Sequence, residues 1–370
     1  MAARVIVFGL TVPMSLTLQG NRFAMLADAG CEVHVVLGEP LAENSVVDAR
    51  VQVHVIEMTR SISPVSDIKS LLAWRRFLKG LGPSHVIGAT PKAAFLSMLA
   101  ARGAKVPNRI MEVWGGRWDG FQGSRAWLLR ITDKMAMAAA TEVIAVSDSL
   151  ADLVVSAGLS KHRPIVLGYG ATQGVDLHRF HVAEVPAESS VGFLGRIAAD
   201  KGIEDLRAVM ALVHQRLPEV QLRIAGDFDS ADPIDVHTRE WLETDPRVTL
   251  IGHVADVPQF LRSLSVLCFP SRREGLPNAV IEASASEVPV VGWDVTGTRD
   301  AIIDGQTGSL VPLGDIAQLA DRICALMSDP QFRAEQGRAA RALMAQRFEA
   351  GLVQAAFVQH LLGDQGVSAA

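Results

Sequence analysis

The sequence predicts an α/β protein with two doubly wound domains, each built on a parallel β-sheet. The chain has 370 residues, which is more than one hydrophobic core usually serves. Short continuous apolar runs alternate with longer segments of helical period, as expected for a parallel sheet covered on both faces. The same alternation restarts after the polar stretch 181–190, so we place the domain boundary there.

The first domain is expected to occupy residues 1–180. Its first helix is predicted at 16–30, ending near Gly30, and a basic helix is predicted at 67–80. Its strands are predicted at 4–10, 32–38, 51–57, 85–90, 108–114 and 142–147.

The second domain is expected to occupy residues 181–345, and a final helical segment follows at 346–370. Its strands are predicted at 190–197, 221–227, 247–254, 266–271, 289–293 and 308–313, with helices at 203–217 and 315–328 among them. The last helix, roughly 346–363, serves one of the two domains, and a return to the first is one option. Because the strand ends of both sheets can face each other, a ligand cleft is expected between the domains.

Simple counts disfavour several classes of protein. The three cysteines, Cys31, Cys268 and Cys324, lie too far apart in the sequence to suggest a disulfide framework or a metal site. The N-terminus leads directly into a predicted strand and lacks the parts of a signal peptide. No run of about 18 uninterrupted apolar residues is present, so no spanning helix is predicted. We therefore expect a cytoplasmic protein.

Positive charge is concentrated in one region of a chain whose net charge is −5. Residues 60–134 hold 13 Lys or Arg against 4 Asp or Glu, whereas the remaining residues hold 22 against 36. The region either contacts something anionic or consists of solvated helix faces. Nucleic acid is disfavoured as a partner, because the overall charge is negative and no recognised binding module is present.

The basic helix at 67–80 suggests one such contact. Leu71, Trp74, Phe77 and Leu78 fall on one side, and Lys69, Arg75, Arg76 and Lys79 fall mostly on the other, although Ile68 and Leu72 blur the division. A basic helix with aromatic residues can lie on an anionic membrane, which predicts a peripheral position on the inner face of the cell membrane. The alternative is that the apolar side packs inward.

The stretch REGLPNAVIEA, residues 273–283, places two glutamates around a tight turn. Pro277 suits the first turn of a helix that begins near Asn278, and Gly275 lets the backbone approach a ligand. Glu274 then lies beside the helix N-terminus, and Glu282 lies about one turn inside. Free N–H groups at such a terminus attract phosphate, and carboxylates accept bonds from sugar hydroxyls. For an isolated pair of glutamates, an acidic loop with a capping side chain would be the commoner explanation.

A second cluster, GFLGRIAADKGIEDL at 192–206, follows another predicted strand. The strand ends at Gly195, Arg196 comes next, and Lys201 precedes an amphipathic helix. Arginine and lysine both suit a diphosphate, one as a planar fork and the other as a mobile charge. The cluster gains weight because it accompanies the glutamate stretch.

Taken in order, the motifs resemble those of glycosyltransferase family 4. The matching stretches are GRIAADKGIEDL, IAGD at 224–227, LIGHV at 250–254, FPSRREGLPNAVIEA at 269–283 and VTGTRDAIIDGQTGSLVP at 295–312. The resemblance implies the GT-B architecture, in which two Rossmann-like domains face each other across a cleft. The first domain would bind the acceptor and the second the nucleotide-sugar donor. The segment 227–235, DFDSADPID, suggests a metal site only superficially and is read as a solvated loop.

The resemblance also implies roles for particular residues. Arg196 and Lys201 would hold the diphosphate, and Glu274 would contact the donor sugar, which makes these three the expected catalytic set. The wider donor site would comprise Gly195, Gly252, His253, Val254, Gly275, Leu276, Pro277, Asn278 and Glu282. Neither a cofactor nor a metal ion would be required.

The acceptor side departs from the pattern. Many family members carry a histidine where this chain has Trp114, in EVWGGRW. Either Arg117 replaces it as a polar group facing the acceptor, or Trp114 simply packs, as tryptophan usually does.

The resemblance therefore predicts a retaining glycosyltransferase of bacterial capsular, exopolysaccharide or lipid-linked glycan synthesis. The donor would be a nucleoside diphosphate sugar, with UDP as the expected nucleotide, and the acceptor a glycan or a polyprenyl-diphosphate-linked sugar. Two alternatives stay open: a sugar-nucleotide epimerase of similar architecture, and a non-catalytic sugar-nucleotide-binding partner of a polysaccharide assembly complex.

Overall fold

The computed structural model describes residues 3–41, 47–59, 63–120, 123–182 and 189–363. The chain forms two compact units: unit 1 comprises Met1–Gly174 and Ala350–Ala370, and unit 2 comprises Val175–Glu349. The division comes six residues before the predicted boundary at 180. Most of the stretch predicted to join the domains, 183–188, lies outside the described residues. Val175 donates its N–H to the carbonyl of Phe348, at 2.8 Å, so the two ends of unit 2 are paired.

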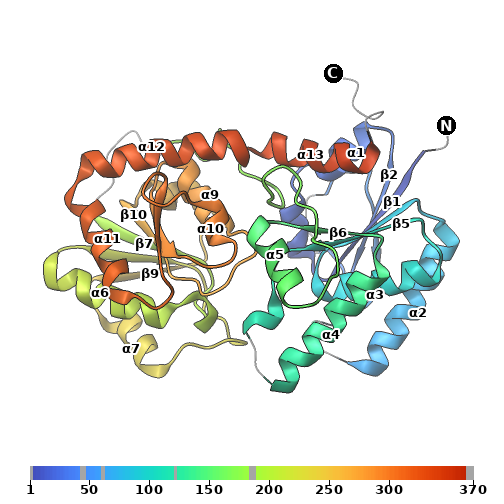
Figure 1. Cartoon of the computed structure of the whole chain (residues 1–370), viewed down its shortest axis with the longest axis horizontal. Helices are drawn as coiled ribbons and strands as arrows, with labels where there is room; N and C mark the ends of the chain where they lie inside the picture. Colours follow the sequence, from blue (N-terminus) through green and yellow to red (C-terminus); the bar gives the residue numbers. More distant parts are fainter. Residues whose placement is uncertain (1–2, 42–46, 60–62, 121–122, 183–188, 364–370) are drawn as a thin grey trace. The chain divides into compact units, whose positions relative to one another are not determined.

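Unit 1 contains a six-stranded parallel sheet of order β3-β2-β1-β4-β5-β6 (Figure 1). The strands are β1 (Val5–Leu10), β2 (Glu32–Leu37), β3 (Gln52–Val55), β4 (His85–Gly88), β5 (Asn108–Val113) and β6 (Glu142–Ala145). The helices are η1 (Pro13–Gln19), α1 (Arg22–Asp28), α2 (Pro64–Leu81), α3 (Pro91–Gly103), η2 (Arg117–Gly120), α4 (Gly123–Ala139), α5 (Asp148–Ser156) and α13 (Ala350–Leu362). All six predicted strands of this domain are thus present.

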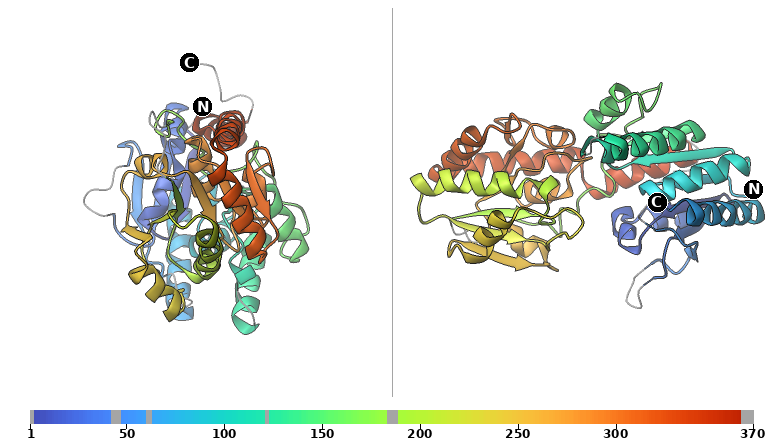
Figure 2. Two further views of the ribbon diagram at one scale, coloured as in Figure 1. Left: turned by 90° about the vertical axis from the view of Figure 1, so that its left-hand side faces the viewer. Right: turned by 90° about the horizontal axis from the view of Figure 1, so that it is seen from below.

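Both faces of this sheet are buried along its central strands β1, β2 and β4, which explains why these strands are mostly apolar. Phe8 packs against Phe23 of α1 and Phe357 of α13 on one face. On the other face Gly9 lies against Trp74 of α2, where a Cβ atom would come within 3.1 Å of the indole ring. Helices α2, α3 and α4 lie side by side on this second face, with α3 in the middle (Figure 2).

Two predicted helices have different bounds in the structure. The segment predicted as one helix at 16–30 is divided into η1 and α1, because Gly20 adopts a positive φ of 54° directly against Gln354. The last helix, predicted to begin at about 346, begins at Ala350 as α13. The preceding helix, α12 (Pro330–Arg347), ends at Arg347. The break allows α13 to belong to unit 1, whereas α12 belongs to unit 2.

Unit 2 repeats the architecture with a parallel sheet of order β12-β11-β10-β7-β8-β9. Its strands are β7 (Ser190–Leu194), β8 (Gln221–Ala225), β9 (Val248–Gly252), β10 (Val266–Phe269), β11 (Val290–Trp293) and β12 (Gly308–Val311). Its remaining helices are η3 (Ala199–Lys201), α6 (Ile203–Arg216), α7 (Val236–Thr244), α8 (Val257–Arg262), α9 (Asn278–Ala285), α10 (Thr298–Ala301) and α11 (Ile316–Ser328).

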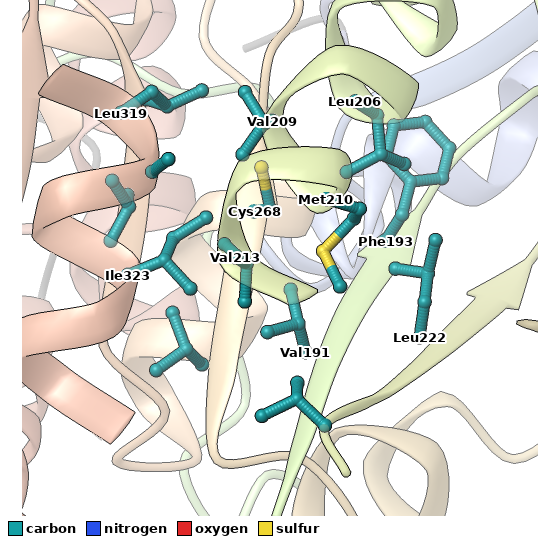
Figure 3. Packing of buried hydrophobic residues seen from close by; sticks show 14 of the residues in the cluster. Val191, Phe193, Leu206, Val209, Met210, Val213, Leu222, Cys268, Leu319 and Ile323 are labelled. Atoms are coloured by element: carbon teal, nitrogen blue, oxygen red, sulfur yellow. The ribbon is translucent and has the colours of Figure 1, made fainter. Parts of the chain in front are cut away.

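The main core of unit 2 lies between one face of this sheet and the helices α6 and α11. Figure 3 shows Val209 and Met210 of α6, Ile323 of α11, and Val191 and Cys268 of the sheet gathered in one cluster. These side chains are fully buried. The cluster fixes where α6 begins, and therefore where the loop between β7 and α6 lies.

Each sheet has one point at which the strand order reverses. In unit 1 this point lies between β1 and β4, and in unit 2 it lies between β7 and β10. The connections leave these neighbouring strands toward opposite faces, so the loops at their carboxyl ends separate and leave room for a ligand. Both predicted clusters of unit 2, at 192–206 and 273–283, follow the strands at its reversal point.

No helix of the described residues has both the length and the apolar character needed to cross a bilayer.

Candidate functional site

The loops after β7 and β10 are held against each other in unit 2. Gly202, with a φ of 70°, lies so close to Pro270 that a Cβ atom would come within 2.0 Å of the proline carbonyl oxygen. The N–H of Arg272 donates to the carbonyl of Asp200, at 3.1 Å. These contacts bring together two motifs that are about 70 residues apart in the chain and fix the side chains between them.

Lys201 and Glu274, the central residues of the two motifs, form an ion pair. The Lys201 Nζ atom lies 2.5 Å from Oε1 of Glu274, and both side chains are mostly buried. Ser271, which is fully buried, donates its hydroxyl to the same Oε1 at 2.6 Å. Ser271 was not singled out from the sequence, although it lies inside the quoted motif. Because both donors reach one oxygen, the orientation of the Glu274 carboxylate is fixed.

Arg196 lies at the start of the loop between β7 and α6, and two carboxylates hold its side chain. It pairs with Asp229 and lies 3.7 Å from Asp200, while its own side chain remains half exposed. Arg273, from the neighbouring loop, also pairs with Asp200, at 3.2 Å. Two arginines therefore converge on Asp200, one from each side of the reversal point. Neither aspartate was recognised as part of the site from the sequence.

The segment 227–235 is a mostly exposed loop, as predicted, and it is also bonded to the site. Ile197 donates its N–H to the carbonyl of Asp227, and Asp229 donates its N–H to the carbonyl of Ile197. Asp232 accepts the N–H of Asp200 on its carboxylate, at 2.9 Å. The segment therefore supports the loop that carries Arg196 and Lys201. Across the described residues, no group of three or more His, Cys, Asp or Glu side chains is arranged to hold a metal ion.

Helix α9 provides backbone donors beside this ion pair. It begins at Asn278 with Pro277 as its N-cap, and no side chain caps it. The N–H of Val280 donates to the carbonyl of Pro277 at 3.1 Å, so the N–H groups of Asn278 and Ala279 are the ones placed to bind an anion. Glu274 precedes the helix, and Glu282 lies in its second turn, as predicted. Burial raises the pKa of Glu282 to about 7, while the charge of Arg179 acts in the opposite direction.

A third loop packs under the turn between the two glutamates. Gly297 has a φ of 78°, and a Cβ atom there would come within 2.5 Å of the carbonyl oxygen of Gly275. The sequence VTGTRD was recognised only as part of the family pattern. The contact shows that this loop limits where the Gly275–Leu276 peptide can lie.

The remaining donor-site candidates lie along the same carboxyl edge of the sheet. Gly195 and Gly252 close the ends of β7 and β9: Gly195 donates its N–H to the carbonyl of Ala225, and Gly252 accepts the N–H of Gly226. His253 follows β9 and is exposed, and Val254 is partly buried. Strand β8 separates β9 from β7, so Gly252, His253 and Val254 lie away from the reversal point at which Lys201 and Glu274 pair.

The two acceptor-side candidates of unit 1 have different surroundings. Trp114 packs against the hydrophobic core and donates its indole N–H to Glu112, at 3.3 Å. Glu112 is buried and paired with Arg22 at 2.8 Å. Arg117 instead lines a pocket and donates to Asp133 at 3.3 Å. Trp114 therefore packs, as one of the two alternatives predicted, and Arg117 is a polar group at the edge of a pocket.

The pocket has a volume of about 310 Å³ and lies at the reversal point of unit 1. It is lined by Thr11, Val12, Thr90, Pro91, Lys92 and Arg117. Thr11 and Thr90 share a hydrogen bond of 2.7 Å between their hydroxyl groups, one from the end of β1 and one from the end of β4. Lys92 is fixed by two bonds from Nζ to the Asp67 carboxylate, at 2.6 and 2.7 Å. Only Arg117 was singled out from the sequence, because the other lining residues belong to no charged motif.

Comparisons of the sequence with known proteins find relatives over both units. Residues 22–170 match the family described as "Glycosyl transferase 4-like domain", and residues 188–329 match "Glycosyl transferases group 1". The capsular polysaccharide biosynthesis glycosyltransferase CapM of Staphylococcus aureus is 32% identical over 355 residues, which are 93% of each chain. An N,N'-diacetylbacillosaminyl-diphospho-undecaprenol alpha-1,3-N-acetylgalactosaminyltransferase of Campylobacter jejuni is 26% identical over 83% of this chain and 85% of its own.

The fold is also similar to that of solved GT-B structures. Alr3699/HepE of Anabaena, in complex with UDP-glucose, has a TM-score of 0.76 over 97% of this chain and 99% of its own, at 18% identity. Sucrose-phosphate synthase of Thermosynechococcus elongatus has a TM-score of 0.79 over 97% and 98%, at 20% identity. These likenesses establish the architecture, and the sequence relationship to CapM over nearly the whole chain establishes the family. The chain is a glycosyltransferase of GT-B fold and belongs to the group 1 enzymes of glycosyltransferase family 4.

Proposed function

We propose that unit 2 binds a nucleoside diphosphate sugar at the reversal point of its sheet. The observation that carries the proposal is the joint position of Lys201, Glu274 and the uncapped start of α9. Lys201, Arg196 and the first N–H groups of α9 bind the diphosphate, since fixed cations and backbone donors stabilise such an anion. Oε2 of Glu274, the oxygen bonded to neither Lys201 nor Ser271, accepts hydrogen bonds from hydroxyl groups of the donor sugar. Glu282 accepts hydrogen bonds from the hydroxyl groups of the ribose.

The proposed reaction is transfer with retention of configuration and without a metal ion. As the bond between the sugar and the diphosphate breaks, negative charge builds up on the departing diphosphate. Lys201, Arg196 and the α9 backbone stabilise that charge, which is where most of the rate acceleration would arise. An oxygen of the diphosphate takes the proton of the acceptor hydroxyl, so Glu274 and Glu282 act as binding groups rather than as an acid and a base.

UDP is the nucleotide that the relatives favour, and a glycan or lipid-linked sugar is the acceptor. A solved relative of the same fold holds UDP-glucose, and the Campylobacter jejuni relative is named for a sugar carried on diphospho-undecaprenol. The pocket of unit 1 is of the size that suits one sugar ring, and its hydroxyl, ammonium and guanidinium groups suit hydroxyl recognition. We place the acceptor sugar there, in a pathway of capsular, exopolysaccharide or lipid-linked glycan synthesis.

A panel of nucleotide sugars, screened by thermal unfolding, tests the donor site. A ligand present at about 100 times its dissociation constant adds roughly 2.7 kcal/mol to the stability of the folded protein. We expect one UDP-sugar to raise the Tm of the wild type and to leave the Tm of the Lys201→Ala variant almost unchanged. Equal stabilisation of both proteins would contradict the assignment.

Product analysis with the same donor then separates transfer from epimerisation, because an epimerase converts the donor without an acceptor. Adding EDTA tests metal independence: transfer should continue at the same rate, and a loss that Mg²⁺ or Mn²⁺ restores would refute it.

A further inference from the structure

We infer that Asp229 competes with the diphosphate of the donor for Arg196 and thereby limits how tightly unit 2 binds its ligand. The inference rests on the proposed function, in which Arg196 binds the diphosphate. Asp229 belongs to the loop between β8 and α7, whereas Arg196 follows β7. The two residues therefore come from the ends of neighbouring strands, and their pairing is a property of the folded unit.

Three cationic side chains at the reversal point of unit 2 each have a carboxylate partner. The pairs are Lys201 with Glu274, Arg273 with Asp200, and Arg196 with Asp229. A diphosphate seeks the same charge-assisted bonds that these carboxylates already make. It gains a full ionic contact with a cation only where one of the pairs opens.

The pair of Arg196 and Asp229 is the most exposed of the three. The side chain of Arg196 is 54% exposed and that of Asp229 is 20% exposed, whereas the side chains of the other two pairs are 14–25% exposed. Water can therefore solvate both partners as they separate, and exposed ion pairs contribute little to stability. Asp200, which lies 3.7 Å from Arg196, keeps its bond to Arg273 when Arg196 moves away.

Backbone bonds hold Asp229 in place independently of Arg196. Its N–H donates to the carbonyl of Ile197 at 3.0 Å, and its Oδ1 accepts the N–H of Ala231 at 2.8 Å. Its other carboxylate oxygen, Oδ2, accepts the bond from Arg196. Asp229 can thus release Arg196 and keep its own conformation, which leaves a fixed anion ready to take Arg196 back when the ligand departs.

This exchange of partners predicts the sign of a mutational effect. The diphosphate gains its bond with Arg196 only as the bond with Asp229 is lost, so the affinity reflects the difference between the two bonds. Removing the charge of Asp229 should therefore tighten binding. If Asp229 instead oriented Arg196 toward the ligand, the same change would weaken binding.

Isothermal titration of the full-length protein with UDP measures this effect. We expect UDP to bind Asp229→Asn about threefold to fivefold more tightly than the wild type at low salt, and the gain to shrink as salt is added. The inhibition constant of UDP in the transfer assay should fall by the same factor. The asparagine amide oxygen can still accept the N–H of Ala231. Asp229→Ser, whose hydroxyl can accept the same bond, is a second variant with the same expected gain.

A double-mutant cycle with Arg196→Met separates competition from general repulsion between Asp229 and the ligand. Without the guanidinium group, Asp229→Asn should change the affinity for UDP by a much smaller factor. An equal gain with and without Arg196 would overturn the inference. The matched control is Asp321→Asn, which breaks an exposed pair with Arg216 elsewhere in unit 2 and should bind UDP as the wild type does.

The outcomes keep the inference apart from the proposed function. The Tm of each variant without ligand shows whether it is folded. UDP binding by both Asp229 variants that equals or falls below that of the wild type would overturn the inference and leave the donor site intact. If neither the wild type nor the variants bind UDP, the proposed function fails and the inference fails with it.

Discussion

The reversal points of the two sheets have the same topology but different contents. In unit 2 the loops after β7 and β10 carry charged motifs that meet as the pair of Lys201 and Glu274. In unit 1 the loops after β1 and β4 meet as a pair of threonine hydroxyls beside a pocket. A site for a diphosphate requires charged side chains and backbone donors in fixed positions, and this requirement produces a recognisable pattern in the sequence. A pocket for a neutral ring requires mainly a suitable shape, which produces no recognisable sequence pattern.

The first prediction tests the charged side of this comparison and carries the largest expected effect. Lys201→Ala should lower the transfer rate by roughly 10²- to 10³-fold, since removing one charged contact to a developing anion costs about 2–4 kcal/mol of barrier. The matched control, Lys161→Ala, removes an exposed lysine of unit 1 and should leave the rate unchanged. Wild-type transfer by Lys201→Ala would show that the resemblance to a diphosphate site is misleading.

The second prediction uses the raised pKa of Glu282. Its folded pKa of about 7 exceeds the ordinary value of 4.5, so between these pH values the folded protein holds a proton that the unfolded chain has released. The contribution of Glu282 to the stability should therefore fall as the pH rises from 4.5 to 7 and level off above. Relative to the wild type, Glu282→Gln should gain at most about 3 kcal/mol over this range.

Chemical denaturation at a series of pH values measures this difference. The control is Glu335→Gln, which changes an exposed carboxyl group on α12 and should follow the wild type throughout. A constant difference between Glu282→Gln and the wild type across this pH range would contradict the burial of the carboxyl group.

The third prediction concerns the loop beneath the glutamate turn. Gly297→Ala would place a Cβ atom 2.5 Å from the carbonyl oxygen of Gly275, so the Gly275–Leu276 peptide, directly after Glu274 and Gly275, must move. We expect a loss of about 1–3 kcal/mol in stability and a weaker donor nucleotide affinity. Gly305→Ala is the matched control, because Gly305 has a similar φ of 73° and open space around it.

Gly305→Ala should therefore show only the strain of the positive φ and keep its nucleotide affinity. Isothermal titration with the donor nucleotide measures both proteins. Equal affinities in the two variants would mean that the Gly297 contact does not position the site.

The fourth prediction addresses the acceptor pocket and has the smallest expected effect. Arg117→Met, combined with Asp133→Asn so that no buried carboxylate loses its partner, should raise the KM for the acceptor about tenfold, which is ~1.4 kcal/mol. Donor affinity should not change. Trp114→Phe removes the bond to Glu112 and part of the packed ring but no group of the pocket, and should leave the acceptor KM near that of the wild type. A larger rise of the acceptor KM from the Trp114 variant than from the Arg117 variant would contradict the placement of the acceptor in this pocket.

The sequence by itself determined the fold and the residues of the charged motifs. Short apolar runs predicted all twelve strands, because a strand buried on both faces, as the central ones are, is rich in apolar residues. Pro277 and the residues after it predicted α9, since a helix start depends on local backbone chemistry. The resemblance of the ordered motifs to family 4 supplied the expectation that comparison with relatives then confirmed.

The tertiary structure alone decided which distant residues share a site and which face of a helix is exposed. Ser271 and Asp229 join the site only because loops from neighbouring strands converge, and this proximity depends on strand order rather than on spacing in the chain. Likewise, Ile68 and Leu72 blurred a helical pattern until the packing of Trp74 showed that they point outward. Local preference fixes an element, but contacts between elements that are far apart in sequence fix its orientation and partners.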